Sequence, residues 1–180
     1  QAPPVPHTRD ADARADRPGA PLWTVCDFRP DVSDPEKTAL EAALEAAGLL
    51  DAWITPDGEI QHPLHHDTLL LPRTSPPASD GRSLETLLQP DPRRAAPVSD
   101  AVISTVLRHI GCAEGEGIAW VDRAGRWQLG PLHGSWSKPA AQYIGHASRE
   151  AERQRRLRQI EAEIGEIQTH LAALLDDLST

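Results

Sequence analysis

The sequence predicts an α+β protein: a small mixed domain with short β-strands, a β-hairpin and two amphipathic helices, followed by a long C-terminal coiled-coil helix. Three observations predict this class. Two short aromatic runs flank a glycine-containing turn near residue 125, two capped amphipathic segments precede them, and an unbroken heptad pattern fills the C-terminal part. Hydrophobic residues make up 39% of the 180 residues and charged residues 25%, as in ordinary globular proteins.

The chain divides by composition into three parts. Residues 1–20 hold four prolines, and Val5 is their only aliphatic side chain larger than alanine, so this part is expected to be a flexible linker. We expect a globular domain over residues 21–137 and a coiled-coil arm over 138–180. The missing initiator methionine and the absence of a signal-like start predict a piece of a longer cytoplasmic protein, and two distant cysteines, Cys26 and Cys112, fit a reducing compartment.

The first half of the domain contains one predicted strand and one predicted helix. Residues 22–28 are rich in β-branched and aromatic side chains and predict a strand. Ser33, followed by Asp-Pro-Glu, is typical of a helix start, and Gly48 occupies the position where a helix needs positive φ to end. Between them one apolar face is predicted, made of Ala39, Leu40, Ala43, Leu44 and Ala47.

The second half holds a further helix and the hairpin. Ser99 or Asp100 is expected to cap a helix that ends at Gly111, with an apolar face of Val102, Ile103, Val106, Leu107 and Ile110. Residues 118–122 and 126–129 predict the hairpin strands around Gly125. The proline-rich stretch 61–97 is expected to be the least regular part of the domain. Trp53, Trp120 and Trp127 are expected in the core.

The C-terminal pattern is the most specific signal. Leucine and isoleucine recur at alternating spacings of three and four, which is a heptad a/d seam. The seam consists of Leu157, Ile160, Ile164, Ile167, Leu171, Leu174 and Leu178. A helix from about Ala140 to Leu178 would be roughly 60 Å long, more than a small domain can bury. We therefore expect the seam to pair with a partner helix: between chains in this piece, and with an incoming arm of the same subunit in the full protein.

The charge along this helix changes sign. Its first half is basic and its second half acidic, an order that opposes the helix dipole unless an antiparallel partner presents the reverse. DNA is a candidate partner of the basic half, although a solvated face is the simpler reading of that stretch and the net charge of −9 argues against a dedicated nucleic-acid module. The candidate contacts are Arg149, Arg153, Arg155, Arg156 and Arg158.

Catalytic and ligand-binding chemistry finds little support. Lys138 is the only lysine beside a glycine-containing loop, but the surrounding residues do not fit a phosphate-binding loop. Two groups of potential zinc ligands are present: His62, His65 and His66 with Asp67, and His109 with Cys112. Their spacing matches no recognised zinc-binding motif, so we favour the interpretation that they are solvated turn residues. We expect no catalytic, cofactor-binding or metal-binding residues. No apolar run approaches the ~20 residues of a membrane span.

Three segments carry a resemblance to a known family. They read GPLHGSWSKPAAQYIGHA over residues 130–147, GLLDAWITPDG over 48–58 and PVSDAV over 97–102. Together they resemble the SMC-like coiled-coil ATPase subunit of the bacterial Wadjet anti-plasmid defence system, over about residues 21–160. The glycine signature of ordinary SMC hinges is absent, so the resemblance does not supply the internal fold.

The resemblance implies a function for this region. In such proteins a central hinge dimerises two subunits, and arms connect it to ATP-binding heads that lie outside this chain. The chain is thus expected to be a non-catalytic hinge that forms a homodimer through its globular domain, with kleisin-like and nuclease subunits in the parent complex. The alternative is an adaptor or regulatory domain whose coiled coil is the surface that binds another protein.

Overall fold

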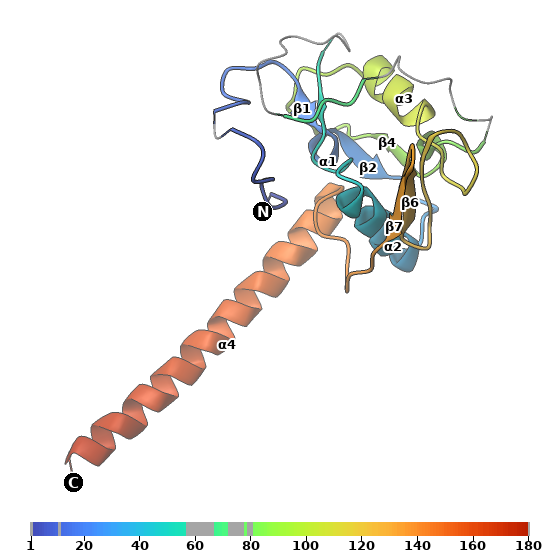
Figure 1. Cartoon of the computed structure of the whole chain (residues 1–180). Coiled ribbons are helices and arrows are strands. Elements are labelled where there is room, and N and C mark those ends of the chain that lie inside the picture. The colour runs from blue at the N-terminus through green and yellow to red at the C-terminus, as the bar shows by residue number, and fades with distance from the viewer. Residues whose placement is uncertain (1, 11, 57–66, 72–77, 79–80, 180) are drawn as a thin grey trace.

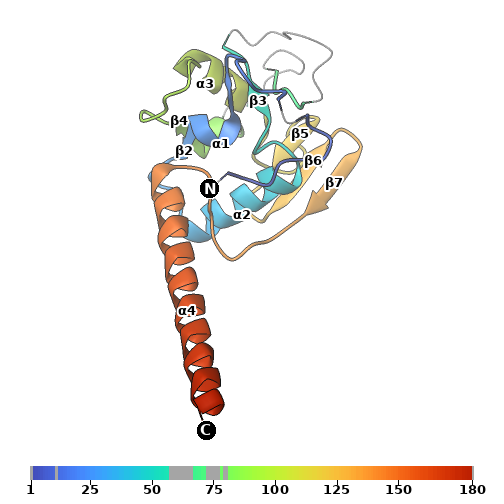
Figure 2. The ribbon, with the colours of Figure 1, turned by 90° about the vertical axis from the view of Figure 1, so that its left-hand side faces the viewer.

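The computed structural model consists of a compact α+β part and one long helix that projects from it (Figures 1 and 2). The structure describes residues 2–10, 12–56, 67–71, 78 and 81–179. Small antiparallel sheets of short strands and several helices form the compact part, so the predicted fold class is confirmed.

Strands and helical elements alternate from β1 to α3, and three successive strands then precede α4. They are β1 (Ala20–Pro21), α1 (Leu22–Val25), β2 (Cys26–Phe28), α2 (Asp34–Ala46), β3 (Trp53–Ile54), the 3₁₀ turn η1 (Leu84–Thr86), β4 (Leu88–Pro90), α3 (Asp100–Arg108), β5 (Ala119–Val121), β6 (Arg126–Leu129), β7 (Leu132–Ser135) and α4 (His146–Ser179). β1 pairs with β3, β2 pairs with β4, and β5, β6 and β7 form a three-stranded sheet, all antiparallel.

The predicted strand over residues 22–28 is wrong in its first half, because Leu22–Val25 form the short helix α1 and only Cys26–Phe28 are extended. The side chains of Leu22 and Val25 are both fully buried. Residues three apart share one side of a helical turn but lie on opposite faces of a strand. The turn also lets the N–H groups of Leu22 and Trp23 donate to carbonyls of residues 52 and 50, at 3.0 and 3.1 Å.

Helix α2 begins and ends where the sequence indicates. Ser33 and Glu36 form a capping box, in which the Ser33 N–H and hydroxyl both donate to Glu36 Oε2 at 3.0 and 2.7 Å. At the other end Gly48 has φ +74°, the left-handed conformation that a helix end favours. The buried face of α2 carries Leu40, Ala43 and Leu44, as predicted.

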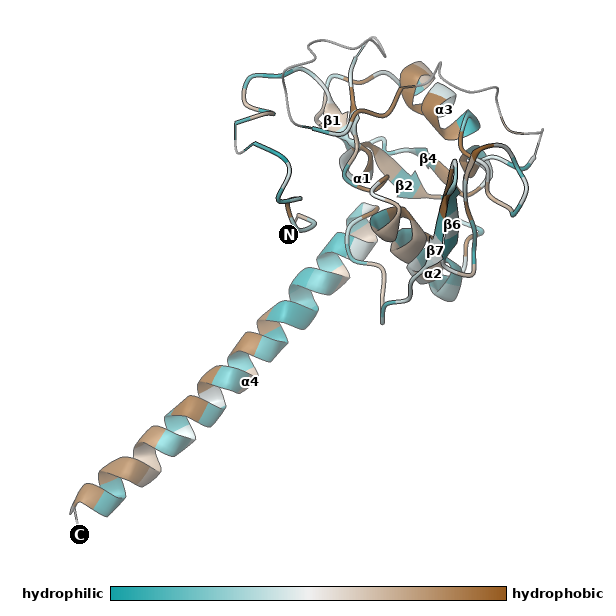
Figure 3. Ribbon diagram, in the orientation of Figure 1, coloured by the Kyte–Doolittle hydropathy of each residue, from teal (hydrophilic) through white to brown (hydrophobic). Residues whose placement is uncertain are grey.

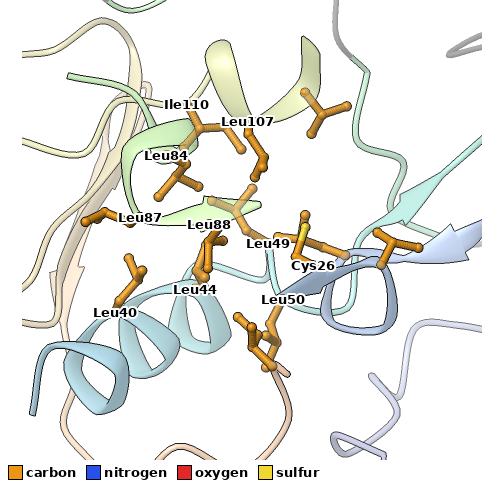
Figure 4. Close-up of a cluster of buried hydrophobic side chains, with 14 of the residues drawn as sticks. Cys26, Leu40, Leu44, Leu49, Leu50, Leu84, Leu87, Leu88, Leu107 and Ile110 are labelled. Carbon is orange, nitrogen blue, oxygen red and sulfur yellow. The ribbon is translucent and has the colours of Figure 1, made fainter. Parts of the chain in front are cut away.

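The core lies between α2, the β2–β4 pair and α3 (Figure 4). Leu40 and Leu44 point up from α2 toward Leu87 and Leu88, while Leu107 contributes from α3. Cys26 lies in the same cluster, and its burial raises the pKa of the thiol well above the usual range, so it stays protonated and unreactive.

Helix α3 begins at the predicted cap, where the Ser99 hydroxyl accepts a hydrogen bond from the Val102 N–H. It ends at Arg108 and not at Gly111, but Ile110 is still buried beyond its end. Elements β4 and η1 fall within the stretch 61–97 that was predicted to be irregular.

The predicted hairpin is present as β5 and β6, and the sequence interpretation missed its third strand, β7. Trp127 on β6 lies opposite Gly134 on β7, where a Cβ atom would come within 2.9 Å of the indole. The glycine therefore makes room for the Trp127 ring, which packs against the core beside α2. Because β7 reads LHGS, it lacks the β-branched residues that usually mark a strand.

The segment over residues 1–20, expected to be a linker, contacts the compact part where it is described. Arg14 forms ion pairs with Asp51 and Asp67 at 3.2 and 2.8 Å, and its guanidinium carbon lies 4.8 Å from the centre of the Trp53 ring. Ala13 is buried. The composition argument considered only apolar burial, and it did not include ion pairs and cation–π contacts.

The capping box makes a pH-dependent contribution that can be tested. The Ser33 hydrogen bonds lower the pKa of Glu36 from 4.5 to about 2. A carboxylate with a lowered native pKa stabilises the fold above its unfolded pKa, and this contribution is lost as the pH falls from 4.5 toward 2. We expect the stability difference between wild type and Glu36→Gln, measured by urea denaturation, to shrink over that interval. A difference that stays constant with pH would contradict the assignment.

Candidate functional site

The candidate site is the place where the compact domain passes into α4, together with the apolar face that α4 carries away from it. Residues 138–145 form a strap across α2 and end at the first turn of α4 (Figure 1). We call this segment the strap. Its anchoring decides the direction in which α4 leaves the domain.

A single buried carboxylate anchors the strap. Glu41 on α2 has no solvent exposure, and its two oxygens accept hydrogen bonds from three consecutive backbone N–H groups of the strap. The donors are Gln142 at 2.6 Å, Tyr143 at 3.0 Å and Ile144 at 2.7 Å. A carboxylate that accepts several backbone hydrogen bonds has its own lone pairs satisfied. It also supplies acceptors for the N–H groups of a segment that belongs to no sheet or helix.

Lys138 supplies the opposite charge to this carboxylate. Its Nζ lies 2.6 Å from Glu41 Oε1 and 2.7 Å from Glu45 Oε2, and its side chain is only 4% exposed. The ammonium also lies 4.7 Å from the centre of the Tyr143 ring. The strap is therefore fixed at its first residue by an ion pair and at its middle by backbone hydrogen bonds.

Gly145 closes the strap against β2. Its φ is +78°, and a Cβ atom there would overlap Asp27 Oδ1 and lie 2.9 Å from Asp27 Cγ. Neither the backbone conformation nor the space accepts a larger residue. The glycine lets the chain turn directly from the strap into His146, the first residue of α4.

Arg149 fixes the first turns of α4 to the domain. Its guanidinium donates to the carbonyls of Trp23 and Tyr143, at 3.3 and 3.1 Å, and to the buried Asp91 at 3.3 Å. Sequence reasoning placed Arg149 among the candidate DNA contacts; the structure shows its guanidinium bonded to the domain, and DNA contact by Arg149 stays a prediction. The only sequence feature that could have indicated this role is the position of Arg149 at the start of the basic half of the helix.

The start of α4 differs from the expectation. The helix begins at His146 and not near Ala140, because residues 142–144 give their N–H groups to Glu41 and not to a helix. Tyr143 and Ile144 are buried in the core cluster, so the compact part extends past residue 137. At 34 residues, α4 is about 50 Å long.

Beyond its first turns α4 meets no other described part of the chain, and its apolar stripe faces outward (Figure 3). The exposed fractions of these side chains lie between 39% at Ile160 and 84% at Leu178. The exposed apolar residues are Leu157, Ile160, Ile164, Ile167, Leu171, Leu174, Leu175 and Leu178. The compact domain thus leaves the predicted seam uncovered, as an arm requires, and which helix pairs with it remains a prediction.

The other candidate DNA contacts lie on the surface of α4. Arg153 is 3.7 Å from Glu150, Arg155 pairs with Glu152, and Arg156 donates to Gln159 at 3.1 Å. These pairs join residues three apart on one helix, the ordinary arrangement of a solvated helix face. Arg158 is exposed on the same helix. DNA contact by these arginines remains a prediction.

The residues considered for metal binding are placed only in part. His62, His65 and His66 lie outside the described residues, and Asp67 is held by Arg14. His109, the residue after the end of α3, has its Nδ1 2.6 Å from the carbonyl of Thr105 in that helix. Over the residues that the structure describes, no group of three or more potential ligands converges, and no helix has the length and apolar character of a membrane span.

Comparison with known proteins gives no relative from which a function could be carried over. No protein-family model matches the chain, and no curated protein and no solved structure matches it either. The site is therefore interpreted from its own geometry.

Removal of the anchoring charge is expected to destabilise the protein strongly. Glu41→Gln takes the negative charge away from three backbone N–H donors and leaves the Lys138 ammonium with Glu45 as its partner, and breaking a buried pair of this kind costs about 3 kcal/mol. Urea denaturation of wild type, Glu41→Gln, Lys138→Met and the double variant measures the effect. The double variant should lose less than the sum of the single losses, because each single change already breaks the same Glu41–Lys138 pair. Strict additivity would show that the pair is not coupled.

Two glycine-to-alanine substitutions should act in opposite directions. Gly145→Ala adds a Cβ atom against Asp27 at a positive φ, so a loss of at least about 2 kcal/mol is expected. Gly165→Ala is the matched control, because Gly165 lies inside α4 with nothing near its Cβ position. There the helix should gain about 0.5–1 kcal/mol. Thermal denaturation followed by circular dichroism measures both, and a neutral Gly145→Ala would contradict the close packing at the junction.

Proposed function

We propose that this chain is the joint of a coiled-coil protein: the non-catalytic dimerisation hinge of an SMC-like ATPase in anti-plasmid defence, with α4 as the start of the returning arm. The observation that carries the proposal is the junction. A strap that a buried carboxylate and an ion pair hold against the domain leads into a helix with an uncovered heptad face, which points away from the compact domain.

A joint must hold its arm at a set angle, and the described contacts suit that task. Glu41, Asp27 and Asp91 belong to three different parts of the domain, and all of them engage residues within 142–149. Such anchoring couples the orientation of α4 to the whole domain. In an enzyme the same density of buried charge would be expected around a cavity for substrate. Here it surrounds a length of backbone.

The parent assembly enters through the family resemblance. Two hinge domains would join two subunits, arms would connect them to ATP-binding heads, and kleisin-like and nuclease subunits would complete the complex. DNA would be handled by that assembly, and the candidate contacts in this chain are Arg149, Arg153, Arg155, Arg156 and Arg158. Every step of ATP hydrolysis would belong to the heads.

The second candidate is an adaptor domain whose coiled coil binds another protein. The exposed seam favours it equally, since a heptad face is a binding surface whatever the domain does. The two functions differ in where association resides. A hinge dimerises through its compact domain, whereas an adaptor associates only through α4.

Disruption of the seam separates the two functions. Ile164→Asp with Leu171→Asp places charges at two a positions and should weaken pairing through α4 at least roughly 100-fold, since each buried side chain contributes about 1.5–3 kcal/mol. If the hinge function is right, this variant remains a dimer in analytical ultracentrifugation, held by the compact domain. If it is a monomer at high micromolar concentration, the adaptor function replaces it.

The control variant adds the same charges to the outer face of α4. Ala162→Asp with Thr169→Asp changes two f positions of the heptad, so it should associate like wild type. Loss of association in this variant would mean that added charge, and not the seam, controls assembly.

A further inference from the structure

Strand β7 is the open edge of the three-stranded sheet. The opposite edge, at β5, is covered: the Gly111 N–H donates to the Ala119 carbonyl at 2.9 Å, and the Gly111 carbonyl accepts from the Val121 N–H at 3.0 Å. Among the strands that the structure describes, β7 pairs with β6 alone, and it forms the outer side of the sheet in Figure 2. An open edge presents a row of N–H and C=O groups to which another strand can pair.

The alternation of hydrogen bonds between β6 and β7 identifies the free groups of this edge. The Trp136 N–H donates to the Gly125 carbonyl at 3.0 Å, which continues the ladder by one hydrogen-bonded pair. Hydrogen-bonded and non-hydrogen-bonded pairs alternate along an antiparallel ladder, so the even-numbered residues of β7 direct their backbone groups to β6. The backbone groups of His133 and Ser135 therefore point away from the sheet, and no other described part of the chain bonds to them.

The sequence of β7 does not block its edge. Proteins commonly protect open edge strands with charged side chains, prolines or bulges. β7 reads LHGS, and residues 130–137 contain no Asp, Glu, Lys or Arg although the chain carries a net charge of −9. Because like charges directly opposite each other destabilise a strand pair, an uncharged edge suits pairing with a second copy of itself.

One face of β7 is apolar and incompletely covered. Leu132, Gly134 and Trp136 lie two positions apart, so they share one face of the extended chain. Leu132 is 64% exposed, and Trp136 is 44% exposed. Trp136 also lines an open groove of about 540 Å³ whose apolar lining comes mainly from α2 and the strap. Strand addition combines main-chain hydrogen bonds with pockets for alternate side chains, and β7 offers both.

Two β7 strands match each other in one antiparallel register. With His133 opposite Ser135 of the second copy, the outward backbone groups of both strands bond to one another. Gly134 then lies opposite its own copy, and Leu132 lies opposite Trp136 of the second copy, beside the groove that this tryptophan lines. A two-fold axis through the glycine pair repeats both contacts, as a self-complementary interface requires.

We propose that β7 pairs in antiparallel orientation with β7 of a second copy of this chain, with His133 opposite Ser135, so that two three-stranded sheets join into one. The inference rests on the proposed hinge function, because it names the surface through which the compact domain dimerises. It leaves the seam of α4 free for an arm of the same subunit.

Proline at an outward position tests the edge. The background protein carries Ile164→Asp with Leu171→Asp, so that association reports the compact domain alone. Ser135→Pro removes an outward N–H group without removing a hydrogen bond to β6, whereas Ser135→Ala, the matched control, keeps that group. Because the two-fold axis repeats the lost bond, dimerisation in analytical ultracentrifugation should be at least about tenfold weaker for Ser135→Pro. Dimerisation of the control should be unchanged.

The outcomes separate this inference from the function on which it rests. If Ser135→Pro dimerises as its control does, the dimer forms elsewhere on the domain, and the edge pairing is overturned while the hinge function stands. If the background protein is already a monomer at high micromolar concentration, the edge pairing and the hinge function are both overturned.

Disulfide cross-linking tests the register independently of the proline variant. In a Cys112→Ser background, whose remaining Cys26 is buried, a chain with both Leu132→Cys and Trp136→Cys should form a disulfide dimer on oxidation. The two positions face each other as a non-hydrogen-bonded pair, the kind with the closer side chains. Either single variant should give little dimer. Self-linking of Leu132→Cys alone would indicate another register, and no link in the double variant would show that β7 does not pair with itself; either result overturns the proposal.

Discussion

The arrangement of the molecule depends on one buried carboxylate. Glu41 is the point where α2, the strap and Lys138 meet, and it accepts N–H groups from three residues about a hundred positions away along the chain. Without these bonds the N–H groups of residues 142–144 would lack hydrogen-bond partners inside the protein. Because an unpaired buried N–H group is energetically unfavourable, the segment would move to find other acceptors. The strap would then lose its path, and α4 would lose its fixed origin.

Buried ion pairs of this kind contribute more to a unique arrangement than to stability, because desolvation offsets much of their attraction. At this junction a unique arrangement has a mechanical consequence. Glu41 fixes the strap, and only glycine fits at position 145 against Asp27. Arg149 donates hydrogen bonds to Asp91 and to two backbone carbonyls. Because α4 is about 50 Å long, a small rotation at its base would move its far end by many ångströms. The density of charge at the junction is what limits that rotation.

Features set by neighbouring residues were readable from the sequence, and features set by distant ones were not. Three features can each be recognised from residues that are close together in the sequence. They are the capping box of Ser33 and Glu36, the hairpin around Gly125 and the heptads of α4. The helical turn at 22–25 depends on carbonyls of residues 50 and 52, and β7 depends on pairing with β6. Glu41 looked like one more acidic residue on a helix. Its adjacency to the buried Leu40, on the inner side of α2, was the one available hint.

The compact domain and α4 differ in how their apolar side chains are covered. As a result, the direction of α4 and its binding surface depend on different residues. The domain buries its own apolar faces, whereas α4 satisfies only its backbone and leaves its leucines and isoleucines exposed. Residues of the junction therefore decide where α4 points, and residues of the seam and its flanks decide what α4 binds. A change at Glu41 should alter the direction of α4 without altering its apolar face, and a change in the seam, at Ile164, should do the reverse. Such independence would suit the proposed hinge, in which the arm must keep its partner while its base transmits motion.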